Sequence, residues 1–136
     1  MVVDASVLTD FLVGRAQTLD ALRREQAGHE HEPLHAPELI EPATLNALRR
    51  LVLAGNLTDQ RATEAASDLE STRLIRYPHA PLRERVWELR HNLTAYDATY
   101  LSLAEALGDC ILLTGDGGLA SWARQSLGEG RVRHVQ

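Results

Sequence analysis

Two short apolar runs in this chain each stop at an acidic residue, and a helical pattern begins shortly after each acid. Met1–Val3 stops at Asp4, and Cys110–Thr114 leads through a glycine to Asp116. Short buried strands that alternate with helices are typical of a parallel sheet, because parallel strands need a crossover connection. Ligands of such sheets bind beyond the carboxyl ends of the strands. The pattern therefore predicts an α/β fold with Asp4 and Asp116 at the mouth of a crevice.

The rest of the chain repeats this alternation. Pro42 suits the first position of a helix, and Gly55 and Gly108 suit helix ends. Hydrophobic periodicity and turn residues together predict a parallel sheet covered by helices on both faces. The other strands are predicted at 34–36, 74–77 and 131–135, the last at an edge. The helices are predicted over residues 6–13, 17–26, 42–54, 58–69, 81–90, 94–107 and 119–127.

Composition limits the class of protein. The 136 residues suit one domain with a real core, and 44% hydrophobic with 24% charged residues is ordinary for a soluble globular protein. No stretch is long and apolar enough to span a membrane, and no signal peptide precedes the first strand, so we expect a cytoplasmic protein without membrane contact. The net charge of −5 excludes a general polyanion binder, but a cluster of acids that holds cations can still meet phosphate. The single cysteine, Cys110, cannot form an internal disulfide and is expected in the core.

A third acid stands at a predicted helix N-terminus. Asp97 lies three residues after Thr94, and Thr-Ala-Tyr-Asp resembles a capping box. Taken singly, Asp4, Asp97 and Asp116 each suit a structural role at a helix N-terminus. If they converge, however, the carboxylates raise each other's pKa values, and a cation among them removes that cost. Ligands that are all oxygen favour Mg²⁺ or Mn²⁺, and such a site suits metal-assisted phosphoryl chemistry.

Four short motifs, in this order and at this spacing, resemble the PIN-domain ribonucleases, specifically the VapC toxins of bacterial toxin–antitoxin pairs. They are Val-Val-Asp-Ala-Ser-Val-Leu at the start, Ala-Pro-Glu-Leu-Ile followed by Leu-Asn-Ala-Leu-Arg-Arg, Leu-Thr-Ala-Tyr-Asp-Ala-Thr-Tyr-Leu-Ser-Leu-Ala, and Leu-Leu-Thr-Gly-Asp. The resemblance covers nearly the whole chain and implies a single PIN-like domain over residues 1–136, folded as a three-layer α/β/α sandwich. It also implies a Mg²⁺-dependent endoribonuclease that hydrolyses RNA phosphodiester bonds, with Mn²⁺ as an alternative ion. Asp4, Asp97 and Asp116 match the family's metal-site acids, which are also its catalytic residues.

The resemblance implies partners as well. A VapB-type antitoxin would fill the groove with its C-terminal segment, and the protein would form a homodimer. Operator DNA would be bound only through the complex with the antitoxin.

One position departs from the family's pattern. The family usually carries a glutamate that aligns with Ala43, which has no ligand atoms. Glu41 is two residues earlier, about 200° away around a regular helix, although it lies at or before the cap if Pro42 begins the helix. Three explanations stay open: Glu41 substitutes, the protein is a weakened natural variant, or Ala43 was introduced to silence a toxic enzyme.

Two other functions therefore remain as alternatives. The first is a catalytically weakened or inactive PIN module that binds antitoxin or RNA without cutting. The second is a phosphatase-like enzyme, which would act on small phosphate esters.

Several other polar residues have weaker functional interpretations. Ser6 and Thr114 stand beside two of the acids and are candidates to orient them by hydrogen bonds. Arg49 and Arg50 are candidates for RNA phosphate contacts, with an exposed helix face as the simpler interpretation.

The remaining residues of interest receive structural interpretations. The histidine run from His29 to His35 is expected in a polar loop, and Gly115–Gly118 lacks the lysine and hydroxyl of a phosphate loop. Trp87 and Trp122 are expected to pack in the core or an interface rather than to stack on bases.

Overall fold

A five-stranded parallel sheet runs through the computed structural model, which describes residues 1–136. The strands lie in the order β3-β2-β1-β4-β5, and each neighbouring pair is parallel. β1 and β4 are therefore neighbours, which brings Asp4 and Asp116 to one edge of the sheet. The strands are β1 (Val2–Val3), β2 (Leu34–Pro37), β3 (Leu74–Tyr77), β4 (Leu112–Thr114) and β5 (Val132–His134).

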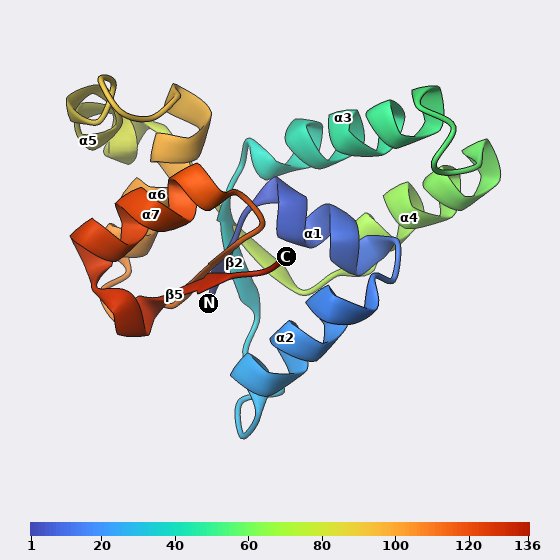
Figure 1. Ribbon diagram of the computed structural model, residues 1–136, viewed down its shortest axis with the longest axis horizontal. Coiled ribbons are helices and arrows are strands. Elements are labelled where there is room, and N and C mark those ends of the chain that lie inside the picture. The colour runs from blue at the N-terminus through green and yellow to red at the C-terminus, as the bar shows by residue number, and fades with distance from the viewer.

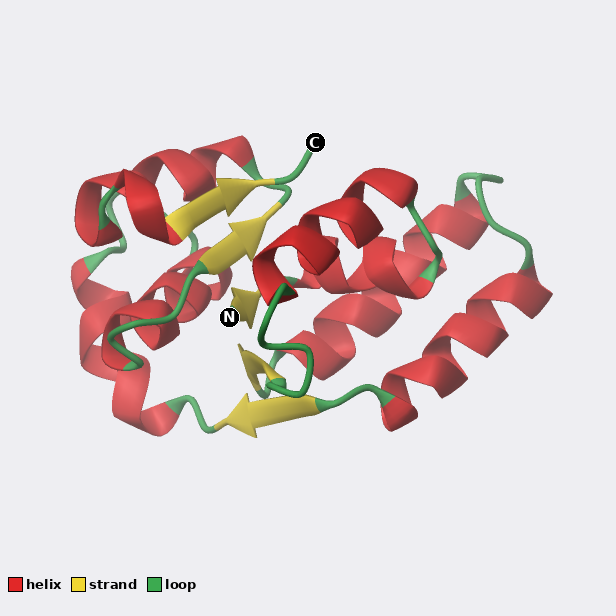
Figure 2. Ribbon diagram, turned by 90° about the horizontal axis from the view of Figure 1, so that it is seen from below, coloured by secondary structure: helices red, strands yellow, loops and turns green.

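Helices cover both faces of this sheet, as Figure 2 shows, so the predicted three-layer sandwich is confirmed. Figure 1 places the first four helices on one side and the last three on the other. The α-helices are α1 (Ala5–Leu12), α2 (Ala16–Gln26), α3 (Ile40–Leu53), α4 (Asp59–Ser71), α5 (Arg83–Glu88), α6 (Ala95–Ala106) and α7 (Gly117–Leu127). Two short 3₁₀ turns, η1 (Ala80–Leu82) and η2 (Glu129–Arg131), precede α5 and β5. All the predicted helices are present, with boundaries within two residues of those expected.

The central strands are buried on both faces. Val2, Val3, Leu112 and Leu113 are each 0% exposed, which explains why these strands have no polar alternation. They belong to one continuous core that also takes in the apolar faces of α1, α6 and α7. The acids that follow β1 and β4 are consequently attached to fully buried strands.

The start of α3 differs from the prediction. The helix begins at Ile40, two residues before Pro42, because Leu39 donates its backbone N–H to His79 Nε2 at 2.9 Å and the chain turns there. Pro42 is therefore the third helical residue, where a backbone N–H would also lack a helical partner. Glu41 falls inside the first turn of the helix and not before it.

Smaller corrections concern β4 and an exposed tryptophan. β4 begins at Leu112 and leaves Cys110 only partly buried, so the cysteine is not the core residue that we expected. Trp122 packs against the core as predicted. Of the two settings predicted for Trp87, the core is wrong, because the residue is 67% exposed, and the interface stays a prediction; the Arg90 guanidinium lies 4.5 Å from its ring centroid.

The histidine run is divided between two kinds of structure. His29 and His31 are exposed in the turn before β2, as expected. His35 lies within β2, where its Nδ1 is 2.7 Å from the Tyr77 hydroxyl. None of the helices is long and apolar enough to cross a lipid bilayer.

Candidate functional site

A groove with a volume of about 1040 Å³ opens at the carboxyl ends of β1 and β4. Its walls come from α1, α3, the start of α6 and the β4–α7 loop. Asp4, Asp97 and Asp116 all line it, so three acids spread over more than a hundred residues of sequence share one hollow. Whether they bind a metal stays a prediction.

Asp4 is the buried member of the three. Its side chain is only 4% exposed, and both of its carboxylate oxygens accept hydrogen bonds. Oδ1 accepts from Ser6 Oγ at 2.6 Å and from the Val7 backbone N–H at 3.0 Å, and Oδ2 accepts from Thr114 Oγ1. Burial raises the pKa of Asp4, and these three bonds oppose that rise. The predicted orienting role of Ser6 and Thr114 therefore has a geometric basis.

The same two hydroxyls bind the β4–α7 loop to Asp4. Ser6 Oγ accepts from the Gly115 backbone N–H at 2.9 Å, and Thr114 Oγ1 accepts from the Asp116 N–H at 2.9 Å. A Cβ on Gly115 would lie 2.9 Å from Ser6 Oγ, so only glycine permits this approach. The role of Gly115 is thus to let the β4–α7 loop approach Asp4 closely.

Asp97 is the acid of the three whose carboxylate is least stabilised by hydrogen bonds. Its backbone N–H donates to Thr94 Oγ1 at 3.2 Å, which is the predicted cap, but its half-buried carboxylate makes no hydrogen bond. Burial, and then the charges of Asp116 and Asp4, raise the pKa of Asp97 to about 6. Asp116 instead caps α7, since its Oδ1 accepts from the Leu119 N–H at 2.8 Å. The capping roles and the convergence on one groove therefore coexist.

The donor set fits a hard cation with a partial protein shell. No three histidine, cysteine, aspartate or glutamate side chains in the structure form a closed ligand set, so the acids share the groove without meeting at one point. Mg²⁺ usually binds through one or two carboxylates and keeps several waters. The unpartnered Asp97 carboxylate, facing two other acids, suits such an ion.

Ala43 and Glu41 occupy different sides of α3. Ala43 lines the groove with the three acids, at the position where the aligned glutamate would stand. Glu41 does not line it; its Oε1 accepts from Arg76 Nε of β3 in an ion pair. Glu41 is therefore engaged elsewhere, which disfavours the idea that it substitutes for the missing acid.

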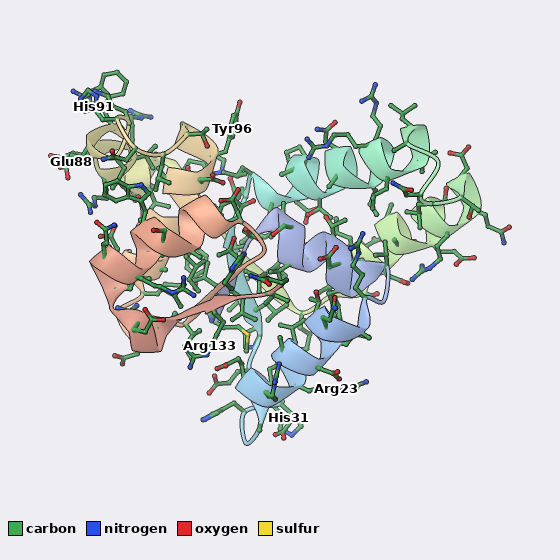
Figure 3. All side chains as sticks on the ribbon, in the orientation of Figure 1. Arg23, His31, Glu88, His91, Tyr96 and Arg133 are labelled. Atoms are coloured by element: carbon green, nitrogen blue, oxygen red, sulfur yellow. The ribbon has the colours of Figure 1, made fainter.

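Two buried hydroxyls in the groove escaped the sequence reasoning. Tyr100 and Thr9 are each 3% exposed, line the groove, and have no hydrogen-bond partner for their side-chain oxygens. Tyr96, one turn earlier on the same helix, is by contrast 71% exposed and projects outward near the start of α6 (Figure 3). A tyrosine or threonine on an otherwise apolar helix face next to an acid is the pattern that would have identified them.

Replacing Thr114 by valine is expected to lower the free energy of unfolding by about 2 to 3 kcal/mol. Valine has the same shape but removes the bond to Asp4 and leaves the Asp116 N–H without its acceptor. Urea denaturation measures the loss. Thr44→Val is the matched control, because Thr44 is equally buried at 0% exposure but its hydroxyl has no partner to lose. Equal losses in the two variants would mean that the Thr114 bonds contribute nothing.

Comparison with known proteins gives consistent matches over most of the chain. The PIN domain family matches residues 1–125. Ribonuclease VapC1 of Mycobacterium tuberculosis is 43% identical over 122 residues, covering 88% of each chain. Ribonuclease VapC9 of the same species is 37% identical over 116 residues, covering 85% of each chain. Ribonuclease VapC3 is 34% identical over 120 residues, covering 88% of this chain and 85% of its own.

Proposed function

We propose, from the premise that this chain belongs to the PIN-domain family, that it is a metal-dependent endoribonuclease of the VapC type. It would hydrolyse RNA phosphodiester bonds as the toxin of a toxin–antitoxin pair. The relatives named Ribonuclease VapC span nearly their whole length in the match, which supports a shared activity.

The observation that most supports this proposal is the unpartnered Asp97 carboxylate beside two other acids. A carboxylate whose pKa is raised by its neighbours costs free energy in the ionised form unless a cation lies close to it. Asp4 and Asp97 are the residues that would hold Mg²⁺ or Mn²⁺, with Asp116 completing the negative pocket.

The chain's own residues divide the remaining tasks. When bound, Mg²⁺ activates water and stabilises charge on the leaving oxygen. Ser6 and Thr114 fix the orientation of the Asp4 carboxylate, and because both donate to it they oppose the rise that burial causes in its pKa. The unpartnered Tyr100 hydroxyl is a donor that can contact a phosphate oxygen in the groove. The helices around the groove limit the access of bulk water to Asp4.

Ala43 supports a second candidate function. Because it contributes no ligand atom to the groove and Glu41 is paired with Arg76, Asp4, Asp97 and Asp116 lack the glutamate that the family usually carries beside them. The absence of this glutamate is what we would expect of a weakened or inactive PIN module that binds RNA or antitoxin without cutting. The two candidates differ only in whether bound RNA is cleaved.

The partners follow from family membership and remain part of the proposal. A VapB-type antitoxin would block the groove, the protein would be a homodimer, and operator DNA would be contacted through the antitoxin complex.

Cleavage of a structured, end-labelled RNA by the purified chain tests the proposal. We expect fragments in Mg²⁺ or Mn²⁺ and none in EDTA, because three carboxylates alone cannot stabilise the leaving oxygen. RNA that is bound but uncut in saturating metal would support the inactive module. Hydrolysis of p-nitrophenyl phosphate without RNA cleavage would instead support the phosphatase-like alternative.

A further inference from the structure

The groove continues beyond the acids along one face of α3 and its C-terminal cap. Ala43, Ala47, Arg50 and Ala54 follow one another at helical spacing and all line it. α1 forms the opposite wall, and Figure 1 shows the two helices side by side. Arg50 lies seven residues after Ala43, about 10 Å along the helix axis. The far end of the groove is therefore a separate region from the acidic end.

Arg50 is an unpaired cation in this region. Its guanidinium makes none of the protein's ion pairs or side-chain hydrogen bonds, whereas Arg15 and Arg76 are each paired with a carboxylate. Asp10, which also lines the groove, is already paired with Arg15 at 3.1 Å. The charge on Arg50 is thus free to bind an anion.

An independent observation points to a ligand in the same groove. Thr9 is only 3% exposed and lines the groove. Its hydroxyl has no hydrogen-bond partner in the protein. Asn46, on the same wall as Arg50, also makes no side-chain hydrogen bond within the protein. Thr9, Asn46 and Arg50 can all donate hydrogen bonds, so the unsatisfied groups suit a ligand rich in acceptor oxygens.

We propose that this far end is a subsite for the RNA backbone, in which Arg50 anchors a phosphate other than the one that is cut. The inference rests on the proposed ribonuclease function and adds a residue that positions the strand. A guanidinium fork binds two phosphate oxygens at once, and every one of the chain's 14 basic residues is an arginine. A groove that is negative at one end and cationic at the other would fix the direction in which the strand lies.

The salt dependence of RNA binding tests this subsite without any cleavage. Fluorescence anisotropy of a short labelled single-stranded RNA is measured in EDTA over a range of salt concentrations. Each phosphate contact on a single strand contributes about 0.7 to the slope of log affinity against log salt. Arg50→Ala should therefore lower the slope by about 0.7. Between about 50 and 200 mM salt, its affinity deficit relative to the unchanged chain should shrink by about 2.6-fold.

Arg49→Ala is the matched control. Arg49 is the neighbouring exposed residue on α3, but it lines the side that faces α4 and not the groove. Its removal should leave the slope unchanged. Arg50→Lys should restore the slope, because the charge is kept, while recovering only part of the affinity, because the fork is lost. Circular dichroism verifies that each variant is folded.

The outcomes separate this inference from the proposed function. Equal slopes for Arg50→Ala and Arg49→Ala, or an unchanged slope for Arg50→Ala, would overturn the subsite even if RNA is cleaved. No RNA binding by the unchanged chain would overturn both the subsite and the ribonuclease proposal.

Discussion

Replacing Ala43 by glutamate should raise Mg²⁺-dependent RNA cleavage by about 10- to 100-fold. The side chain at this position lines the same groove as Asp4, Asp97 and Asp116, so the new carboxylate adds an oxygen ligand where only a methyl group now stands. Even residues that merely orient a metal's ligands change affinity or activity by about this factor, and a direct ligand should do at least as much. The rate of RNA cleavage at saturating Mg²⁺ and the affinity for Mn²⁺ should rise together.

Ala47→Glu is the matched control for this gain. Ala47 lies one turn further along α3 and lines the same groove, so it adds the same charge at a distance from the acids. A gain confined to Ala43→Glu would identify position 43 as the missing ligand. No gain, or an equal gain in both variants, would mean that the alignment or the assigned role is wrong.

Asp97→Asn should reduce cleavage by about 100-fold or more and, at the same time, stabilise the metal-free protein. Loss of a charged ligand removes several kcal/mol of charge stabilisation at the reacting phosphate. The same change removes the carboxylate that suffers from burial and from the charges of Asp116 and Asp4. Cleavage assays and thermal unfolding in EDTA measure the two opposite effects.

The pH dependence of this stability has a defined sign. The pKa of Asp97 rises from 3.8 to about 6 on folding, so the folded state holds the proton more tightly. The resulting penalty is absent below pH 3.8, grows as the pH rises towards 6, and is complete above that. Metal-free Asp97→Asn should show a smaller decline, since the raised pKa of Asp4 still contributes one, and Mg²⁺ should reduce the decline in the unchanged chain. A decline of unchanged size in the variant would assign it to other groups.

The sheet and the acids could be predicted from the sequence because the relevant patterns are local. A buried strand of two or three apolar residues followed by an acid and a helix is readable at β1 and at β4. The neighbouring position of these strands was a hypothesis that only the topology resolves. The acids' role as metal ligands remains a prediction, since their positions are compatible with capping as well.

The start of α3 could not be predicted because its causes are distant in sequence. His79 provides the acceptor for the Leu39 N–H, forty residues away, and Arg76 provides the partner of Glu41. The preference of proline for the first helical position predicts that the helix begins at Pro42. The position and the ion pair of Glu41 therefore depend on residues in β3 and in the turn after it.

The exposure of Trp87, which excludes the core alternative, could have been predicted from its position. Leu82 and Leu89 form the buried face of the η1–α5 segment, and Trp87 lies off that face by helical spacing. The expectation of a core position rested on the size and apolar character of tryptophan and not on its place in the helix. The unpartnered hydroxyls of Thr9 and Tyr100, by contrast, depend on rotamers that no sequence pattern specifies.

The two hydroxyl bridges between Asp4 and the β4–α7 loop have a consequence for biosynthesis. In a nascent chain Asp4 is synthesised long before its Thr114 partner, because the two residues are 110 positions apart in sequence. An incomplete polypeptide that ends before β4 has neither the neighbouring strand nor the second carboxylate. Synthesis through β4 and the loop that carries Asp116 is thus a condition for assembling the acidic pocket.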